Sequence, residues 1–173
     1  MALVIQPALP GDAIELAALH TAVAGRLTAT YGKGPWSSQT TERGMLFAMR
    51  TSEVFVARDD TGIVGVFQLA TKKPWAIDPK YFTPCGRPLY LTGMAVALDR
   101  QRQGIGRKCL EEARRIATEF PAGAIRLDAY DAPAGAGKFY ARCGFVERGR
   151  VTYRGVPLIY YEMLLDEVTT NGR

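Results

Sequence analysis

The stretch that most limits the fold runs from residue 88 to residue 120, where a strand pattern, a glycine loop and a helix pattern follow one another. PLYLTGMAVAL (88–98) is a predicted strand with Gly93 inside it, where a glycine often marks a bulge or the close approach of another backbone. QRQGIGRK (101–108) supplies two glycines among cations and amides. From 104 to 120 the apolar positions are spaced 4, 4, 3 and 4 residues apart, as on an amphipathic helix. A strand followed by a long helix is a unit of an α/β domain.

The rest of the chain extends this pattern into a complete α/β domain. A short strand at 3–5 precedes a helix for which Asp12 is the expected N-cap, in a capping box with Glu15. The further predicted elements, in chain order, are a helix at 41–50, a hairpin of strands 53–60 and 62–71, an irregular segment at 72–88 with four prolines, a strand at 124–130, a short helix at 133–143 and a closing hairpin of 145–153 and 157–165. We expect a mixed sheet in a single domain over residues 1–166, with a frayed tail at 167–173.

Composition narrows the class of protein. The 173 residues are enough for one domain with its own core, and no apolar run approaches the length that spans a membrane. Asp12 and Glu15 interrupt the apolar N-terminus where a secretory signal would continue. Three separated cysteines fit reduced thiols of a cytoplasmic protein better than a disulfide framework or a zinc site. The net charge of +5, concentrated at 100–115, favours a polyanion, either a nucleic acid or a phosphate-rich ligand.

The glycine loop has the features of an anion-binding site. Glycines allow consecutive backbone N–H groups to converge on an anion at the positive end of the following helix. The stretch lacks the Walker A pattern, which disfavours a kinase or ATPase. A dinucleotide fingerprint would need Gly or Ala where Cys109 stands. Asp128, at the end of the next strand, imitates the ribose-binding acid of that motif, so a dinucleotide-binding oxidoreductase stays as a minor alternative.

Two motifs together carry a resemblance to a known family. QRQGIG matches the pattern Q/R-x-x-G-x-G/A after the strand LTGMAV, and FYARCGF (139–145) matches a Tyr followed by x-x-x-G-F. With this spacing the sequence resembles the GNAT superfamily of N-acetyltransferases, over nearly the whole chain from 3 to about 165. The resemblance implies an α/β fold with a mixed, largely antiparallel sheet flanked by about four helices.

The resemblance also implies a co-substrate, acetyl-coenzyme A, and no metal. In this family the strand before the loop binds the pantetheine arm, the loop cradles the pyrophosphate, and a tyrosine often donates a proton to the departing thiolate. Tyr140 matches that tyrosine. The residues implied for binding the co-substrate are Met94, Ala95, Val96, Gln101, Arg102, Gln103, Gly104, Ile105, Gly106, Arg107 and Lys108. An amine would attack the thioester directly, which agrees with a chain whose single histidine, His20, is poorly suited to a catalytic triad.

The acceptor half of the site is less defined. Pro133 stands where the family often has Asn, and the general base is open among Asp128, Asp131 and Glu162, with a water chain equally suited. Aromatic residues in Gly/Pro loops often line recognition sites. The residues expected to contact the substrate are Tyr31, Trp36, Trp75 and Asp128. The absence of a marked acidic cluster leaves a small-molecule amine as the expected acceptor.

Several alternatives stay open at this point. Tyr140 could be a core aromatic beside Phe139 and Phe145, and a packed or partly exposed His20 is favoured over a catalytic one. The 72–88 segment could shape the acceptor pocket or form a contact in a homodimer. A non-catalytic nucleic-acid module would need aromatic residues interleaved with the cations of 100–115, and that region lacks them. A coenzyme A sensor without turnover would keep the fold and the ligand.

Overall fold

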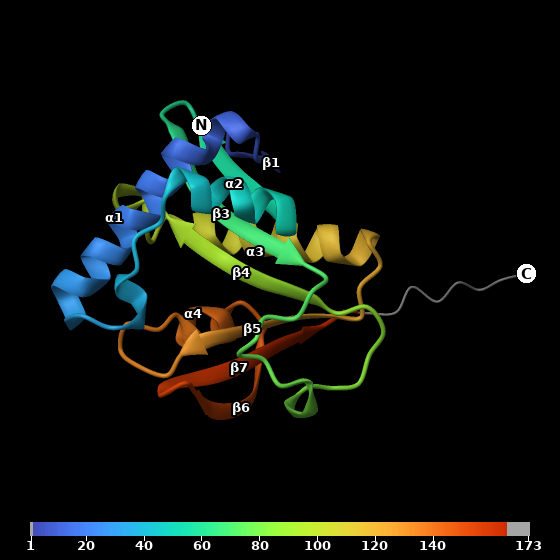
Figure 1. Ribbon diagram of the computed structural model, residues 1–173. Coiled ribbons are helices and arrows are strands. Elements are labelled where there is room, and N and C mark those ends of the chain that lie inside the picture. Colours follow the sequence, from blue (N-terminus) through green and yellow to red (C-terminus); the bar gives the residue numbers. More distant parts are fainter. Residues whose placement is uncertain (1, 166–173) are drawn as a thin grey trace, which may run out of the picture.

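A seven-stranded sheet with one parallel pair organises the molecule (Figure 1). The computed structural model describes residues 2–165. The strands lie in the order β1-β2-β3-β4-β5-β7-β6, and every neighbouring pair is antiparallel except β4 and β5. The strands are β1 Val4–Pro7, β2 Glu53–Asp59, β3 Gly62–Ala70, β4 Leu89–Val96, β5 Ala124–Tyr130, β6 Val146–Tyr153 and β7 Val156–Leu164. The predicted order of strands and helices is confirmed.

Helices cover both faces of the sheet (Figure 1). Helices α1 (Ala13–Tyr31) and α2 (Glu42–Thr51) pack on one face, over a core that includes Leu16 and Val56. Helices α3 (Ile105–Glu119) and α4 (Gly137–Arg142) pack on the other, over a core that includes Phe67 and Leu127. Short 3₁₀ turns lie at Pro10–Asp12, Pro35–Ser37, Pro79–Tyr81 and Leu98–Arg100. None of the helices within residues 2–165 combines the length and apolar character needed to cross a membrane.

The sheet opens between its two parallel strands. β4 and β5 pair only through Leu89 with Ile125 and Tyr90 with Arg126, so the remaining length of each strand has no partner on this side. The pairing of β3 with β4 shifts register at Val66/Gln68, opposite Gly93. Gly93 has a φ of +59°, and a Cβ there would overlap the Gln68 amide, so this bulge requires glycine. The predicted bulge is confirmed, and it lies beside the opening.

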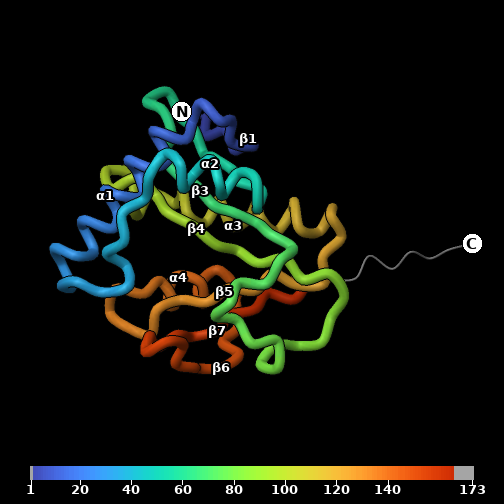
Figure 2. The backbone as a smooth tube through the Cα atoms, viewed as in Figure 1, coloured from blue at the N-terminus to red at the C-terminus, as the bar shows by residue number. Residues whose placement is uncertain are grey.

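The 72–88 segment covers the half of the sheet formed by β5 and β7 (green in Figure 2). Ile77 and Phe82 pack against Tyr90 and Tyr160. The Tyr160 hydroxyl donates to the Ala76 carbonyl and accepts from the Asp78 N–H at 3.1 Å. Apart from its 3₁₀ turn the segment is irregular, as its prolines predicted.

Asp12 is the N-cap residue of α1, as predicted, but the capping box with Glu15 and the predicted start of the short helix were wrong for the same kind of reason. Asp12 makes no side-chain cap to α1, because its carboxylate accepts from the Leu9 N–H at 2.8 Å and pairs with Arg58. Glu15 instead accepts the Ile63 N–H at 2.8 Å. The short helix predicted from 133 begins only at Gly137, because the Gly135 N–H closes a turn on the Ala132 carbonyl at 2.8 Å. Tertiary contacts and turn geometry override the local signals in both places.

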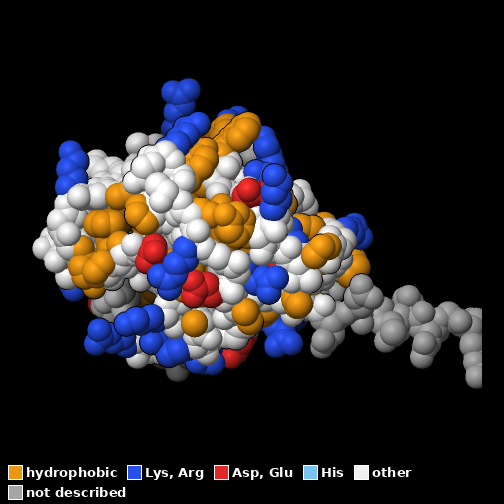
Figure 3. Space-filling model, turned by 90° about the horizontal axis from the view of Figure 1, so that it is seen from below, with side chains coloured by type: hydrophobic (Ala, Val, Ile, Leu, Met, Phe, Trp, Pro, Cys, Tyr) orange, Lys and Arg blue, Asp and Glu red, His pale blue; other side chains and the backbone are white. Residues whose placement is uncertain are grey.

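Charge is spread over the surface. On the face seen from below in Figure 3, Lys and Arg side chains are interspersed with apolar side chains and a few acidic ones. On α3, Arg115 pairs with Glu112 and with Glu119, the latter at 2.6 Å, which reduces the free positive charge of that helix.

Candidate functional site

Two adjoining cavities fill the opening between β4 and β5. The first, here called the loop cavity, has a volume of about 540 Å³ and lies against residues 100–107. The second, the aromatic cavity, has a volume of about 470 Å³ and lies between α1 and β5. Both are lined by Val23, Leu27, Met94, Ala95, Ala134, Ala136 and Tyr140. The two cavities therefore form one cleft with a polar loop at one end and aromatic side chains at the other.

The loop cavity is suited to an anion. Gly104 caps α3 with a φ of +81°, and a Cβ built there would meet no protein atom within 4 Å. The first backbone hydrogen bond after the loop runs from Lys108 N–H to Gly104 O at 3.1 Å. The N–H groups of the helix turn before it have no helical partner and lie at the positive end of the helix dipole. Arg102, Arg107 and Arg142 line the same cavity and add positive charge.

Tyr140 lies where the two cavities meet. Its ring is 9% exposed and packs in the core against Phe139, Phe145 and Tyr161, with the Phe145 ring centroid at 5.7 Å. Burial raises the pKa of Tyr140, and the nearby Asp128 and Cys143 act in the same direction. The phenol therefore stays protonated at neutral pH and is available as a proton or hydrogen-bond donor.

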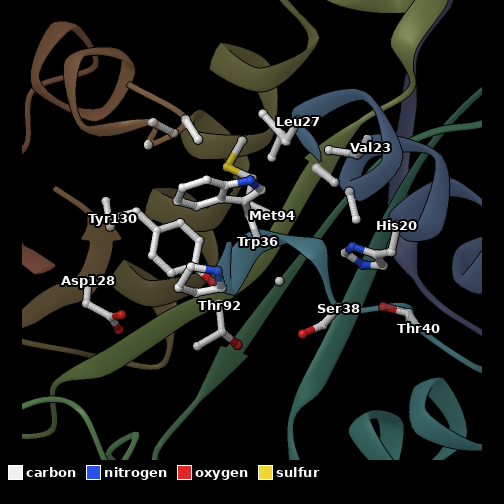
Figure 4. Close-up of a pocket in the computed structure, with 18 of the residues that line it drawn as sticks. His20, Val23, Leu27, Trp36, Ser38, Thr40, Thr92, Met94, Asp128 and Tyr130 are labelled. Carbon is white, nitrogen blue, oxygen red and sulfur yellow. The ribbon is translucent and has the colours of Figure 1, made fainter. Parts of the chain in front are cut away.

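The aromatic cavity is built from two sides of the sheet opening (Figure 4). Trp36 and Tyr130 meet edge to face with their ring centroids 5.7 Å apart. The Trp36 indole N–H donates to the Gly32 carbonyl at the end of α1 at 2.9 Å, which fixes the ring. A Cβ at Gly34 would lie 2.5 Å from the indole, so the loop can carry the ring so close only with glycine there.

Asp128 and His20 lie on opposite sides of this cavity, with Thr92 between them in the view of Figure 4. Asp128 makes no ion pair within residues 2–165, and burial raises its pKa. Burial lowers the pKa of His20, and its Nε2 atom has no hydrogen-bond partner in the described part of the chain. The histidine is therefore neutral at pH 7, and among residues 2–165 Asp128 is the one acidic side chain that lines the cavity.

Comparison with known proteins identifies the family. A family model described as "Acetyltransferase (GNAT) domain" matches residues 50–147, more than half of the chain. The chain belongs to the GNAT acetyltransferase family. No curated protein matches this GNAT sequence significantly.

Solved structures share this GNAT fold at low sequence identity. An N-acetyltransferase from Staphylococcus aureus Mu50 superposes with a TM-score of 0.72 at 17% identity, over 96% of this chain and all of that one. A Salmonella typhimurium protein solved with its cofactor acetyl-CoA gives 0.71 at 14%, over 99% of both chains. A ribosomal-protein-alanine N-acetyltransferase from Brucella melitensis gives 0.71 at 18%, over 94% of this chain and 99% of that one. The expected mixed sheet flanked by four helices is confirmed as the GNAT fold.

Most residues implied by the GNAT resemblance come together in the cleft. The loop cavity is lined by Met94, Ala95, Val96, Gln101, Arg102, Gly104, Ile105, Gly106, Arg107 and Tyr140. Gln103 and Lys108 do not line it, and the Gln103 amide donates to the Asp99 carbonyl at 3.1 Å within the loop. Arg100 and Arg142 also line the loop cavity, although neither was among the residues predicted to bind the co-substrate. Arg142 could have been found as the cation two residues after Tyr140 on the same short helix.

The four residues expected on the substrate side of the GNAT site do not all lie in the cleft. Trp36 and Asp128 line the aromatic cavity. Tyr31, at the end of α1, is exposed and lines neither cavity. Trp75 is 81% exposed and lies with Tyr81 at a separate surface hollow beside β6 and β7.

Sequence reasoning also missed part of the substrate side. His20 was predicted to be packed or partly exposed, which its intermediate burial agrees with, but it was not expected to line the cleft, and Tyr130 was not considered. Tyr130 follows Asp128 by two residues on one strand, so the period of a strand could have placed it on the same face.

Proposed function

We propose that this GNAT protein transfers the acetyl group of acetyl-coenzyme A to the nitrogen of a small amine. The observation that carries the proposal is the single cleft between β4 and β5. An anion-binding loop lies at one end, an aromatic cavity with one carboxylate lies at the other, and Tyr140 lies where they meet.

The residues of the loop cavity fit the chemistry of coenzyme A. The diphosphate would be held by the N–H groups that open α3 and by Arg102 and Arg107, with Gly104 leaving space for it. The open edge of β4 at Met94–Val96 offers backbone donors and acceptors for the amide groups of the pantetheine arm. The aliphatic side chains of Val23 and Leu27 line the same stretch of the cleft.

Acetyl-coenzyme A supplies an acetyl group activated as a thioester. Backbone N–H groups at the open β4 edge would stabilise negative charge on the carbonyl oxygen as the amine attacks. Tyr140 would donate its hydroxyl proton, or a hydrogen bond, to the departing sulfur. Because burial raises its pKa, Tyr140 assists the thiolate rather than protonating it fully, and a thiol with a pKa near 8.5 needs no more. Of the carboxylates considered as bases, only Asp128 lines the cleft and could receive the proton of the amine.

The domain organisation and the setting are part of the proposal. The sheet uses strands from residue 4 to residue 164, which supports one domain over 1–166. The predicted tail at 167–173 lies outside the described residues. We assign the protein to the cytoplasm because its three cysteines are free thiols in the structure.

A thermal-shift titration tests the proposal. Acetyl-coenzyme A at a hundred times its Kd should stabilise the protein by about 2.7 kcal/mol, a rise in Tm of roughly 5 to 10 °C. NADH is the comparator, and release of free coenzyme A with added amines then reports turnover. No shift with acetyl-coenzyme A, or a shift with NADH alone, would contradict the proposal. Binding without turnover of any amine would favour a coenzyme A sensor.

A further inference from the structure

The charges around the aromatic cavity define the kind of amine that it can accept. Its titratable lining residues are His20, Asp128, Tyr130 and Tyr140, and no Lys or Arg is among the described residues that line it. We propose, resting on the function proposed above, that the acceptor is a small monoamine. It carries one ammonium group on an aromatic or bulky apolar body, with no acid group and no second cation.

The carboxylate of Asp128 is the feature of the cavity that favours a cation. Two other carboxylates withdrawn from solvent have arginine partners: Glu162 pairs with Arg126 at 3.0 Å and Asp59 with Arg100 at 3.3 Å. Asp78, half-buried like Asp128, makes no ion pair within residues 2–165, but its carboxylate accepts the Lys80 N–H at 3.0 Å. Asp128 has no such partner within residues 2–165, although it is half-buried on β5 and lines a cavity. A carboxylate left unpaired in a partly desolvated cavity is a candidate for binding a ligand cation. The ammonium of the amine supplies the missing partner.

Trp36 and Tyr130 provide the surface for the rest of the amine. Their edge-to-face pair forms one wall of the cavity, and Val23 and Leu27 form an aliphatic wall towards the loop cavity. Aromatic faces bind both flat apolar groups and the ammonium itself. The volume of about 470 Å³ lies in the range of small-molecule sites and exceeds what a methylamine or ethylamine would fill.

The same lining acts against two other classes of amine. An amino acid would bring a carboxylate into a cavity whose described lining contains no Lys or Arg side chain to pair with it, so the desolvation of that carboxylate would be uncompensated. A polyamine would bring a second ammonium, and the described residues of the opposite wall offer it only neutral groups, among them the Ser38 and Thr40 hydroxyls and the His20 imidazole, so no second ion pair can form. Specificity for a monoamine thus arises from the Asp128 carboxylate that the cavity provides and from the lack of further charged partners in its described lining.

A panel of matched amines tests this inference, with release of free coenzyme A as the readout. Phenethylamine and phenylalanine differ only by a carboxylate, and putrescine adds a second cation to a slender body. We expect kcat/KM for phenethylamine to exceed those for phenylalanine and putrescine by at least about tenfold, the effect of one uncompensated polar group. Preference for phenylalanine, putrescine or the N-terminal amine of a peptide would overturn the inference.

Two variants connect the preference to the cavity. Asp128→Asn should lower kcat/KM for phenethylamine by about thirtyfold or more, because it removes the partner of the ammonium. Asp60→Asn, at an exposed hairpin turn, is the matched control and should leave the rate unchanged. Trp36→Leu should raise KM for phenethylamine more than KM for butylamine. Equal rates for Asp128→Asn and the parent would overturn the inference.

The outcome also separates this inference from the function on which it rests. If acetyl-coenzyme A raises the Tm and none of the panel is acetylated, the inferred substrate class is wrong while co-substrate binding stands. If acetyl-coenzyme A does not bind, the proposed function itself fails.

Discussion

Arg126 forms a buried ion pair with Glu162 at the point where the sheet divides. The Nε–Oε2 distance is 3.0 Å, and the two side chains are 6% and 1% exposed. Arg126 is also the last residue of β5 that pairs with β4, through Tyr90. Its Nη2 donates to the Thr83 carbonyl at 2.6 Å, and the Thr83 N–H donates to Glu162 at 3.2 Å. The pair therefore joins β5, β7 and the 72–88 segment at the closed end of the cleft.

Removing one member of this pair should destabilise the fold strongly. Arg126→Met removes the closer arginine partner of the buried Glu162 carboxylate and leaves it only the half-exposed Arg148 at 3.7 Å, so we expect a loss of about 3 kcal/mol in the free energy of unfolding, measured by urea denaturation. The double variant Arg126→Met/Glu162→Leu should recover much of the loss, because no unpaired charge remains. Arg115→Met, which breaks exposed pairs on α3, is the control and should cost less than about 1 kcal/mol. A loss no larger than that of the control would mean that the buried pair is replaceable.

Gly104 should be sensitive to charge as well as to backbone strain. Its φ of +81° disfavours any other residue, and Asn tolerates this region best. Gly104→Asp and Gly104→Asn place side chains of nearly equal size in the open space of the loop cavity. We expect the Asp variant to lose the thermal shift caused by acetyl-coenzyme A, because its carboxylate repels the diphosphate, and the Asn variant to keep part of it. Equal shifts for the two variants would argue against a diphosphate at this position.

Tyr140→Phe should separate catalysis from packing. The Phe ring preserves the contacts with Phe139 and Phe145, so the Tm and the Kd of acetyl-coenzyme A should change little. The loss of the donor should lower kcat about 10- to 100-fold. Tyr161→Phe is the control, because Tyr161 is buried in the same cluster but lines neither cavity. An unchanged kcat in Tyr140→Phe would mean that Tyr140 serves only as a core aromatic.

His20 should make the stability depend on pH. Burial lowers its pKa in the folded protein below the usual 6.5, so below pH 6.5 the unfolded chain binds more protons than the folded chain. The burial of neutral His20 therefore makes its full contribution to the free energy of unfolding above pH 6.5. That contribution is lost as the pH falls from 6.5 towards the lowered pKa. His20→Gln should therefore show a smaller fall in Tm than the parent between pH 7.5 and pH 5.5. Since the chain has a single histidine, no second imidazole confuses the comparison. Parallel falls would show that His20 titrates normally.

Local patterns in the sequence were sufficient for much of the fold. The β-branched and aromatic runs EVFVARDD and GIVGVFQLAT, with the turn between them, predicted the β2–β3 hairpin. The apolar spacing after Gly104 predicted α3 to within a residue at either end. These elements depend on side-chain periodicity and turn chemistry, which neighbouring residues determine. The short helix predicted from 133 begins only at Gly137, because residues 132–135 form a turn in which Gly135 lies against the Tyr130 carbonyl, a contact that periodicity does not report.

Sequence and tertiary structure each determined part of the candidate site. The sequence by itself determined the loop and Tyr140, because their residue types and spacing carry the chemistry. Asp128 and Tyr130 lie two residues apart on one strand and therefore share a face, although only Asp128 was predicted as a site residue. Only the tertiary structure decided that this face meets Trp36 and His20, while Trp75, in an equally suggestive loop, lies elsewhere. The physical reason is that β4 and β5 stop pairing after Arg126, and the cavity forms where the strands part and side chains distant in the sequence meet.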